Sequence, residues 1–279
     1  MNTIISLSLL YCAIIALFIV ADIVAQNNPF STVGKGLKTR SPRLTLIASV
    51  VAAVVTIFLL KKLISIGVPL EYFMAVPFLC ILYSFGRRIF HSLKYFSLYS
   101  VFFSAGITSL WFFYPNWLVL DAVACLIAVE LLSVFGKMTF KQCVILSLVV
   151  VVFDVFMVLV TGVMQEVVAG IESTPAVFTI PKYLAGVSAT MGLGDAIIPG
   201  IVVLMAFNKA REFKAPLLGY MTLVGYAVGF IVVAVVCMFV ETQPATLYLL
   251  PAVVGTLVAT ARCYGITFLD LWNDTAHSA

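Results

Sequence analysis

The sequence is poor in charge. Only 10% of its 279 residues are Asp, Glu, Lys or Arg, whereas a soluble globular domain has about 25%. Hydrophobic residues make up 63% of the chain and the mean hydropathy is +1.17. A chain with so few charges cannot cover a soluble fold with polar side chains, so the composition indicates a polytopic membrane protein. The net charge of +4 is too small to suggest a nucleic-acid partner.

Metal-binding side chains are also scarce. The only two histidines, His91 and His277, are predicted in a loop and in the carboxyl-terminal tail, which argues against a histidine-ligated metal site. The six cysteines form no CxxC pair and all lie in apolar runs. We therefore interpret them as small buried hydrophobic residues rather than as disulfides or metal ligands. No metal and no cofactor are expected.

Long apolar runs dominate the chain, and nine of them have the roughly 17–25 residues that a membrane-spanning helix needs. The predicted fold is all-α, a single transmembrane domain over 1–279, with four helices in about 1–114 and five helices carrying the candidate site in about 115–279. No basic segment precedes the first run, so we interpret it as a retained span rather than a cleaved signal peptide. The expected spans are about Ile4–Val24, Leu44–Ile66, Val68–Phe85, Tyr95–Phe113, Trp117–Phe135, Gln142–Val163, Ala185–Asn208, Ala215–Val240 and Pro244–Tyr264, with a loop at about Met164–Pro181 and a short polar tail.

Positive charge is distributed unevenly between the predicted loops. Most of the 16 Lys and Arg residues fall in the first, third, fifth and seventh loops. Such an excess marks the cytoplasmic side of a membrane protein. The amino terminus is therefore predicted to be outside or lumenal, and the carboxyl terminus cytosolic.

Two carboxylates interrupt consecutive apolar spans, Asp154 in the sixth and Asp195 in the seventh. A charge in hydrocarbon costs at least ~2.5 kcal/mol on insertion scales, so such a carboxylate is expected to face the protein interior or water, near a partner. Asp154 follows Lys141 by 13 residues, and Asp195 precedes Asn208 by 13 residues. At 1.5 Å per residue, both lie roughly 20 Å from the cytosolic ends of two antiparallel helices. We expect the two carboxylates to form a pair.

A carboxylate pair that water reaches has a well-defined chemistry. Peptide hydrolysis needs one carboxylate to deprotonate a water and the other to protonate or polarise the carbonyl, and two close carboxylates share one proton. Gly192 and Gly194 flank Leu193 just before Asp195. Each glycine weakens a helix by roughly 1 kcal/mol relative to alanine and lets another backbone approach. An extended substrate strand is therefore expected here, with ordinary packing of helices at small residues as the alternative.

Three short segments follow one another along the second half of the chain: Phe153-Asp154, Gly192-Leu193-Gly194-Asp195, and the stretch from Gln243-Pro244-Ala245-Thr246 to Pro251. Together they resemble the three signatures of the GxGD intramembrane aspartyl proteases, and signal peptide peptidase more than presenilin. The resemblance implies a presenilin-like or signal peptide peptidase-like helical bundle with Asp154 and Asp195 as catalytic residues. It also implies that Pro244, Ala245 and Thr246 lie near the aspartates and help to hold substrate. Signal-peptide remnants and type II membrane proteins are the implied substrates, and the endoplasmic reticulum the implied location.

The chain departs from that family pattern at two positions. The family usually has tyrosine where this chain has Phe153, so any hydrogen bond from the tyrosine hydroxyl is lost. The third signature is usually Pro-Ala-Leu, and here Thr246 replaces the leucine with a β-branched, polar side chain. Both departures bear on efficiency or substrate preference more than on the reaction.

Three alternative functions stay open at this point. A proton-coupled transporter also uses carboxylates within the membrane, but it would favour an internal repeat, and none is found. A prepilin-type peptidase shares the GxGD string, although it usually has lysine where this chain has Ile197. A scaffold that binds membrane helices without cutting them is the third, and a homo-oligomer is compatible with any of them. Glu130, deep in the fifth span, is predicted to be an interhelical hydrogen-bond partner rather than a catalyst.

Overall fold

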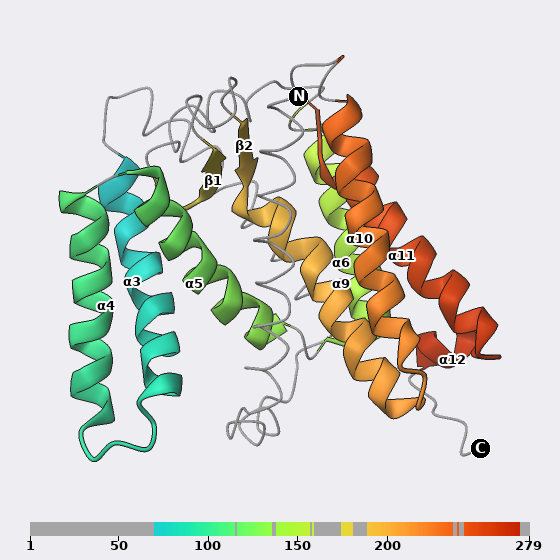
Figure 1. Cartoon of the computed structure of the whole chain (residues 1–279), viewed down its shortest axis with the longest axis horizontal. Helices are drawn as coiled ribbons and strands as arrows, with labels where there is room; N and C mark the ends of the chain where they lie inside the picture. Colours follow the sequence, from blue (N-terminus) through green and yellow to red (C-terminus); the bar gives the residue numbers. More distant parts are fainter. Residues whose placement is uncertain are drawn as a thin grey trace.

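Helices account for most of the part of the chain that the computed structural model describes, which is residues 70–114, 116–135, 138–156, 158, 174–180, 189–236, 239 and 243–273. The first two predicted spans lie outside these residues. A two-stranded sheet and a short terminal helix complete the described fold (Figure 1). The elements are α3 (Leu70–Ile89), α4 (Phe96–Phe113), α5 (Trp117–Phe135), α6 (Phe140–Val155), β1 (Val177–Ile180), β2 (Ala189–Gly192), α9 (Leu193–Glu212), α10 (Leu217–Val236), α11 (Thr246–Cys263) and α12 (Phe268–Asn273).

Five of the described helices, α4, α5, α9, α10 and α11, are long and apolar enough to cross a membrane. Large apolar side chains such as Phe102 of α4 and Ile231 of α10 are exposed on the outside of the bundle. Such exposure is costly in water but suits contact with lipid. The chain is therefore a multi-pass membrane protein, while the full set of nine spans stays a prediction.

The centre of the bundle is α9. It packs against α5, α6, α10 and α11, and its buried residues lie on all of its sides. A helix that is apolar all round is expected at the centre of a fold rather than at its edge. In Figure 1, α3 and α4 lie on one side of α5, while α6, α10 and α11 gather around α9.

Among the described helices from α3 to α11, each runs opposite to the one before it. In Figure 1, α3, α5, α9 and α11 run down the view, and α4, α6 and α10 run up it. Basic residues occupy the last turns of three of the descending helices: Arg87 and Arg88 in α3, Lys209 and Arg211 in α9, and Arg262 in α11. Positive charge therefore gathers at one end of the bundle.

The small sheet corrects two sequence predictions. β1 lies inside the expected loop at Met164–Pro181, and β2 lies inside the expected seventh span, which begins as a helix only at Leu193. The strands pair antiparallel, with Val177 opposite Gly192 and Ile180 opposite Ala189. Pairing satisfies the backbone polar groups of an extended segment, so these residues do not need to be helical to avoid unpaired groups.

The carboxyl-terminal segment also differs from its prediction, because α12 forms where a polar tail was expected. A reciprocal capping box starts this helix: Asp270 N–H donates to Thr267 Oγ1 at 3.2 Å, and Thr267 N–H donates to Asp270 Oδ2 at 2.8 Å. Phe268 and Trp272 then pack their rings against Phe140, the first residue of α6. The short helix thus fixes the start of α6.

A buried ion pair links α3 to α5. Arg88 Nη2 lies 3.0 Å from Glu130 Oε1, and the Ser84 hydroxyl donates to the same oxygen at 2.7 Å. Arg88 also donates to the hydroxyl of Ser133 on α5. Glu130 is only 2% exposed. The prediction that Glu130 is an interhelical hydrogen-bond partner is confirmed.

Candidate active site

Asp154 lies near the carboxyl end of α6. The helix starts with a capping box in which Gln142 N–H donates to Thr139 Oγ1 and the Gln142 side chain accepts from Thr139 N–H. From this start α6 packs against both α9 and α11. The Asp154 side chain is half-buried in that contact region.

Asp195 occupies the first turn of α9, three residues after the capping residue Gly192. Its carboxylate accepts from the backbone N–H of Gly192, which otherwise has no side-chain cap. In a capping box, the side chain of the third helical residue accepts a hydrogen bond from the backbone N–H of the capping residue, and here Asp195 makes that contact. Gly192 is extended, and a Cβ at this position would lie only 3.1 Å from Asp195 Oδ2. The glycine therefore leaves room for the carboxylate.

The structure brings the two predicted carboxylates together. Asp154 and Asp195 are 41 positions apart in sequence, yet they lie close enough to interact electrostatically. Both are half-buried rather than enclosed. The pair lies where α6 meets α9, and the antiparallel course of the two helices makes this meeting possible.

The third motif meets the pair from α11. Gln243 and Pro244 precede the helix, Ala245 is its capping residue, and Thr246 is its first residue. Thr246 is 2% exposed, and its hydroxyl donates a hydrogen bond to Asp154 Oδ2. Its backbone N–H makes a second contact with the same carboxylate.

Two helix N-termini therefore point at the carboxylate pair. The capping residues Gly192 of α9 and Ala245 of α11 supply no side-chain cap of their own. The Asp195 carboxylate accepts a backbone hydrogen bond at the start of its own helix, α9. The Asp154 carboxylate, on α6, accepts one at the start of α11. The first N–H groups of a helix lack partners inside it and carry partial positive charge, so each N-terminus favours a nearby carboxylate. This arrangement lowers the cost of holding negative charge inside the bundle.

The remaining residues predicted for the site differ in burial and in their contacts. Leu193 is buried, and its N–H donates to Ala176 O at 2.8 Å, which ties α9 to the sheet. Gly194 is exposed, and a Cβ there would meet nothing within 4 Å. Phe153 is half-buried beside Asp154. Pro244 lies two residues before α11 rather than in its first turn.

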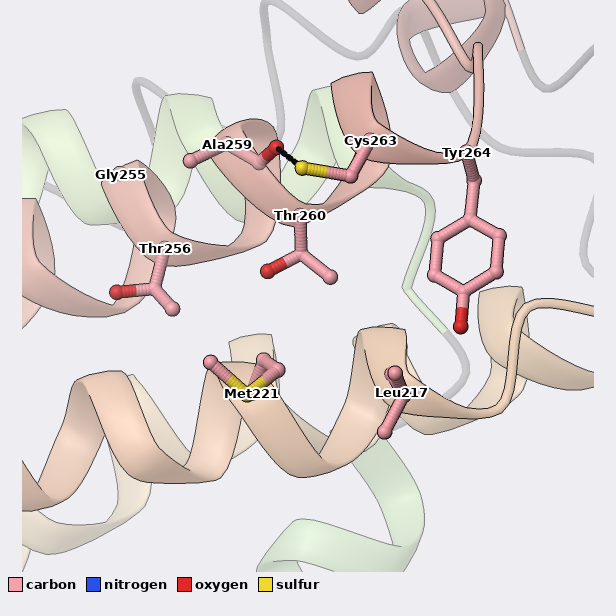
Figure 2. Close-up of a pocket in the computed structure, with 8 residues that line it drawn as sticks. All are labelled: Leu217, Met221, Gly255, Thr256, Ala259, Thr260, Cys263 and Tyr264. Carbon is pink, nitrogen blue, oxygen red and sulfur yellow. Dashed lines mark hydrogen bonds between the residues drawn. The ribbon is translucent and has the colours of Figure 1, made fainter.

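A separate groove runs between α10 and α11, nearer their basic end. Figure 2 shows Met221 and Leu217 of α10 facing Thr256 and Thr260 of α11 and the following residue, Tyr264, across it. Thr256 lies ten residues beyond Thr246, about 15 Å along the helix. The groove is thus distinct from the carboxylate pair. Among the described residues, no cluster of His, Cys, Asp and Glu is suited to a metal ion.

Sequence reasoning missed the direct bond between Thr246 and Asp154. It placed the third motif near the aspartates, but it interpreted the threonine as a change in packing. The available signal was chemical: a hydroxyl replaces an aliphatic side chain at a position that the resemblance places beside a carboxylate. A buried hydroxyl needs a hydrogen-bond partner, and Asp154 provides one.

Comparison with known proteins finds relatives of this chain. The family model described as "Signal peptide peptidase" matches residues 1–278. Mouse (Mus musculus) signal peptide peptidase-like 2A is 29% identical over 167 residues, which are 52% of this chain and 32% of that protein. Human (Homo sapiens) signal peptide peptidase is 34% identical over 122 residues, 40% of this chain and 32% of that protein. The matched part thus spans about a third of each relative.

A solved structure described as a presenilin family intramembrane aspartate protease has the same fold. It superposes with a TM-score of 0.62 at 17% sequence identity, and the match covers 93% of this chain and 98% of that one. At this identity the likeness concerns the arrangement of helices alone. The expectation of a presenilin-like bundle is confirmed at that level. Because the family model covers nearly the whole chain, the protein belongs to the signal peptide peptidase family of intramembrane aspartate proteases.

Proposed function

We propose that this protein is an intramembrane aspartyl endopeptidase that cleaves transmembrane helices, with Asp154 and Asp195 as its catalytic residues. The observation that carries the proposal is the meeting of these two half-buried carboxylates at the starts of α9 and α11. One carboxylate deprotonates a water, and the other protonates or polarises the scissile carbonyl. Because two close carboxylates share a proton, the pair supplies both roles at once.

The substrate is a single transmembrane segment that unwinds beside the site. A peptide bond within a helix is shielded by side chains and its carbonyl is hydrogen-bonded, so an extended segment is easier to attack. The β1–β2 hairpin leads directly into the helix that carries Asp195, and Gly194 leaves an open approach next to it. Signal-peptide remnants and type II membrane proteins are the substrate classes we propose, by analogy with the family.

The topology completes the proposal. We propose that the basic ends of α3, α9 and α11 face the cytosol, because positive charge favours that side of a membrane. With the nine predicted spans, this orientation has the amino terminus in the lumen and the carboxyl terminus in the cytosol. Residues 1–279 act as one transmembrane domain in the endoplasmic reticulum membrane. Lipid and peptide substrates are the partners, and a homo-oligomer is compatible with the large apolar outer face.

The test is cleavage of a labelled type II transmembrane peptide by purified protein in lipid. Asp154→Asn and Asp195→Asn keep the size of the side chain and remove its ability to exchange a proton, so both are expected to abolish product. Asp121→Asn on α5 is the matched control, because this half-buried carboxylate lies outside the pair, and it is expected to retain cleavage. Equal product from all four proteins would instead identify a contaminating protease.

Absence of product from a folded native sample would refute the proposal. Ion flux into liposomes that needs Asp154 and Asp195 would then favour the transport alternative. Binding of the peptide without cleavage or flux would favour a scaffold.

A further inference from the structure

We propose that Thr246 is a positioning residue that holds the Asp154 carboxylate in its working orientation against Asp195. The inference rests on the proposed function, because it assigns a role in that reaction. It goes beyond the family resemblance, which implies that this part of the third motif holds substrate. In this chain the residue contacts a catalytic group instead.

The contact itself is well suited to fixing an orientation. The Thr246 hydroxyl donates to Asp154 Oδ2, and the backbone N–H of the same residue also faces that carboxylate. A carboxylate on a flexible side chain rotates about two bonds, and two donors from one rigid residue remove most of that freedom. Catalytic groups need to be held within about 0.5 Å of their productive geometry. Hydrogen bonds to a charged acceptor are about twice as strong as neutral ones.

The surroundings make this donor hard to replace. Thr246 is 2% exposed, so bulk water does not take over the bond when the hydroxyl is removed. It is the first residue of α11, where the backbone N–H has no partner within the helix. The bond therefore joins α6 to the start of α11 and satisfies groups on both helices.

The threonine is also the position at which this chain departs from the usual Pro-Ala-Leu motif. A leucine here would offer the Asp154 carboxylate an apolar surface and only the backbone donor. The Thr246 hydroxyl is thus a feature of this chain, and removing it should show how much it contributes to positioning Asp154. The other departure from the family pattern is Phe153, next to Asp154 in sequence, and its ring has no hydroxyl that could replace that of Thr246.

The experiment compares Thr246→Val, which keeps the branched shape without the hydroxyl, with Thr246→Ser, which keeps the hydroxyl. Cleavage of the labelled peptide is followed to obtain kcat and KM separately. We expect Thr246→Val to lower kcat about tenfold or more, as the loss of one charge-assisted hydrogen bond implies, and to change KM less than about twofold. Thr246→Ser should recover most of the lost kcat.

Thr256→Val is the matched control on the same helix. The Thr256 hydroxyl donates to Ala252 O at 2.7 Å within α11, and the residue borders the groove in Figure 2 rather than the carboxylate pair. Its kcat is expected to match the native value. If Thr246→Val does not fold, Thr246→Ala replaces it against the same serine variant. A rise in KM with kcat unchanged, or equal kcat in the valine and serine variants, overturns the positioning role.

An infrared difference spectrum separates this inference from the proposed function. The carboxyl stretching band that disappears in Asp154→Asn belongs to Asp154, and its position reports the hydrogen bonds to that group. We expect Thr246→Val to shift this band and Thr256→Val to leave it in place, whether or not the native protein cleaves the peptide. A band that Thr246→Val leaves in place overturns the inference, whereas a native protein without activity refutes the proposed function alone.

Discussion

The buried ion pair between Arg88 and Glu130 provides a direct test of what holds α3 against α5. Replacing Arg88 with methionine removes the guanidinium that lies 3.0 Å from Glu130 Oε1. Glu130, which is 2% exposed, then keeps the hydrogen bond from the Ser84 hydroxyl but loses the cation beside it. Breaking a buried pair by removing one partner costs about 3–5 kcal/mol of unfolding free energy. We expect Arg88→Met to fall in that range.

The double variant Arg88→Met/Glu130→Leu should be more stable than Arg88→Met alone. Removing both charges also removes the buried, uncompensated carboxylate, and apolar replacements of buried ion pairs are often close to neutral. The measurement is reversible unfolding in mixed detergent micelles for the native protein, both single variants and the double. The expected coupling free energy is at least about 1.5 kcal/mol, within the range seen for residues in contact.

A matched control lies at the basic end of α9. Lys209 Nζ contacts Glu212 Oε2 at 2.7 Å, and Glu212 is 39% exposed. Lys209→Met leaves behind a carboxylate that water can hydrate, so it should cost no more than about 1 kcal/mol. If the effects of Arg88→Met and Glu130→Leu add within about 0.5 kcal/mol, the reasoning about the buried pair is wrong. A stable double variant that has lost peptide cleavage would instead make Glu130 part of the catalytic machinery.

Two pairs of glycines provide further predictions. Gly192→Ala puts a Cβ 3.1 Å from Asp195 Oδ2, so we expect a lower kcat for peptide cleavage. The Cβ of Gly194→Ala meets nothing within 4 Å in the protein, and this variant should raise KM if a substrate strand passes there. A higher KM for Gly192→Ala together with a lower kcat for Gly194→Ala would exclude these roles for the two glycines. Gly225→Ala puts a Cβ 2.4 Å from a threonine hydroxyl and 2.9 Å from a carbonyl oxygen of α11, while Gly255→Ala meets nothing within 4 Å. Because close helix packing depends on such small residues, Gly225→Ala should lower the thermal unfolding temperature and Gly255→Ala should leave it unchanged; similar temperatures for both would contradict this packing argument.

Hydrophobic runs were sufficient to locate the long helices. The prediction for α5, Trp117–Phe135, agrees with the structure at both ends, and that for α4 differs by one residue. Within a bilayer a helix satisfies its own backbone groups, so length and hydropathy alone determine where it forms. Sequence also selected the two carboxylates correctly as a spatial pair, because lone charges in apolar spans need partners.

Segments whose structure depends on distant partners were not predicted. β2 reads as part of an apolar span, and only its pairing with β1 makes it a strand. The signal that was available, the β-branched and aromatic residues of Val177–Ile180, is weak, since strand preference depends strongly on context. The capping box at Thr267 and Asp270 was a clearer signal for α12, and it could have been recognised from the sequence.

The sequence by itself therefore determined the membrane class, the family resemblance and the pairing of the two aspartates, since these depend on composition and local spacing. The tertiary structure alone decided how the aspartates are held. Asp195 caps the start of its own helix α9, whereas Asp154 caps α11 and accepts the Thr246 hydroxyl from 92 positions away in the chain. No local rule links two residues so far apart, because their contact arises only when α6, α9 and α11 pack around a common point.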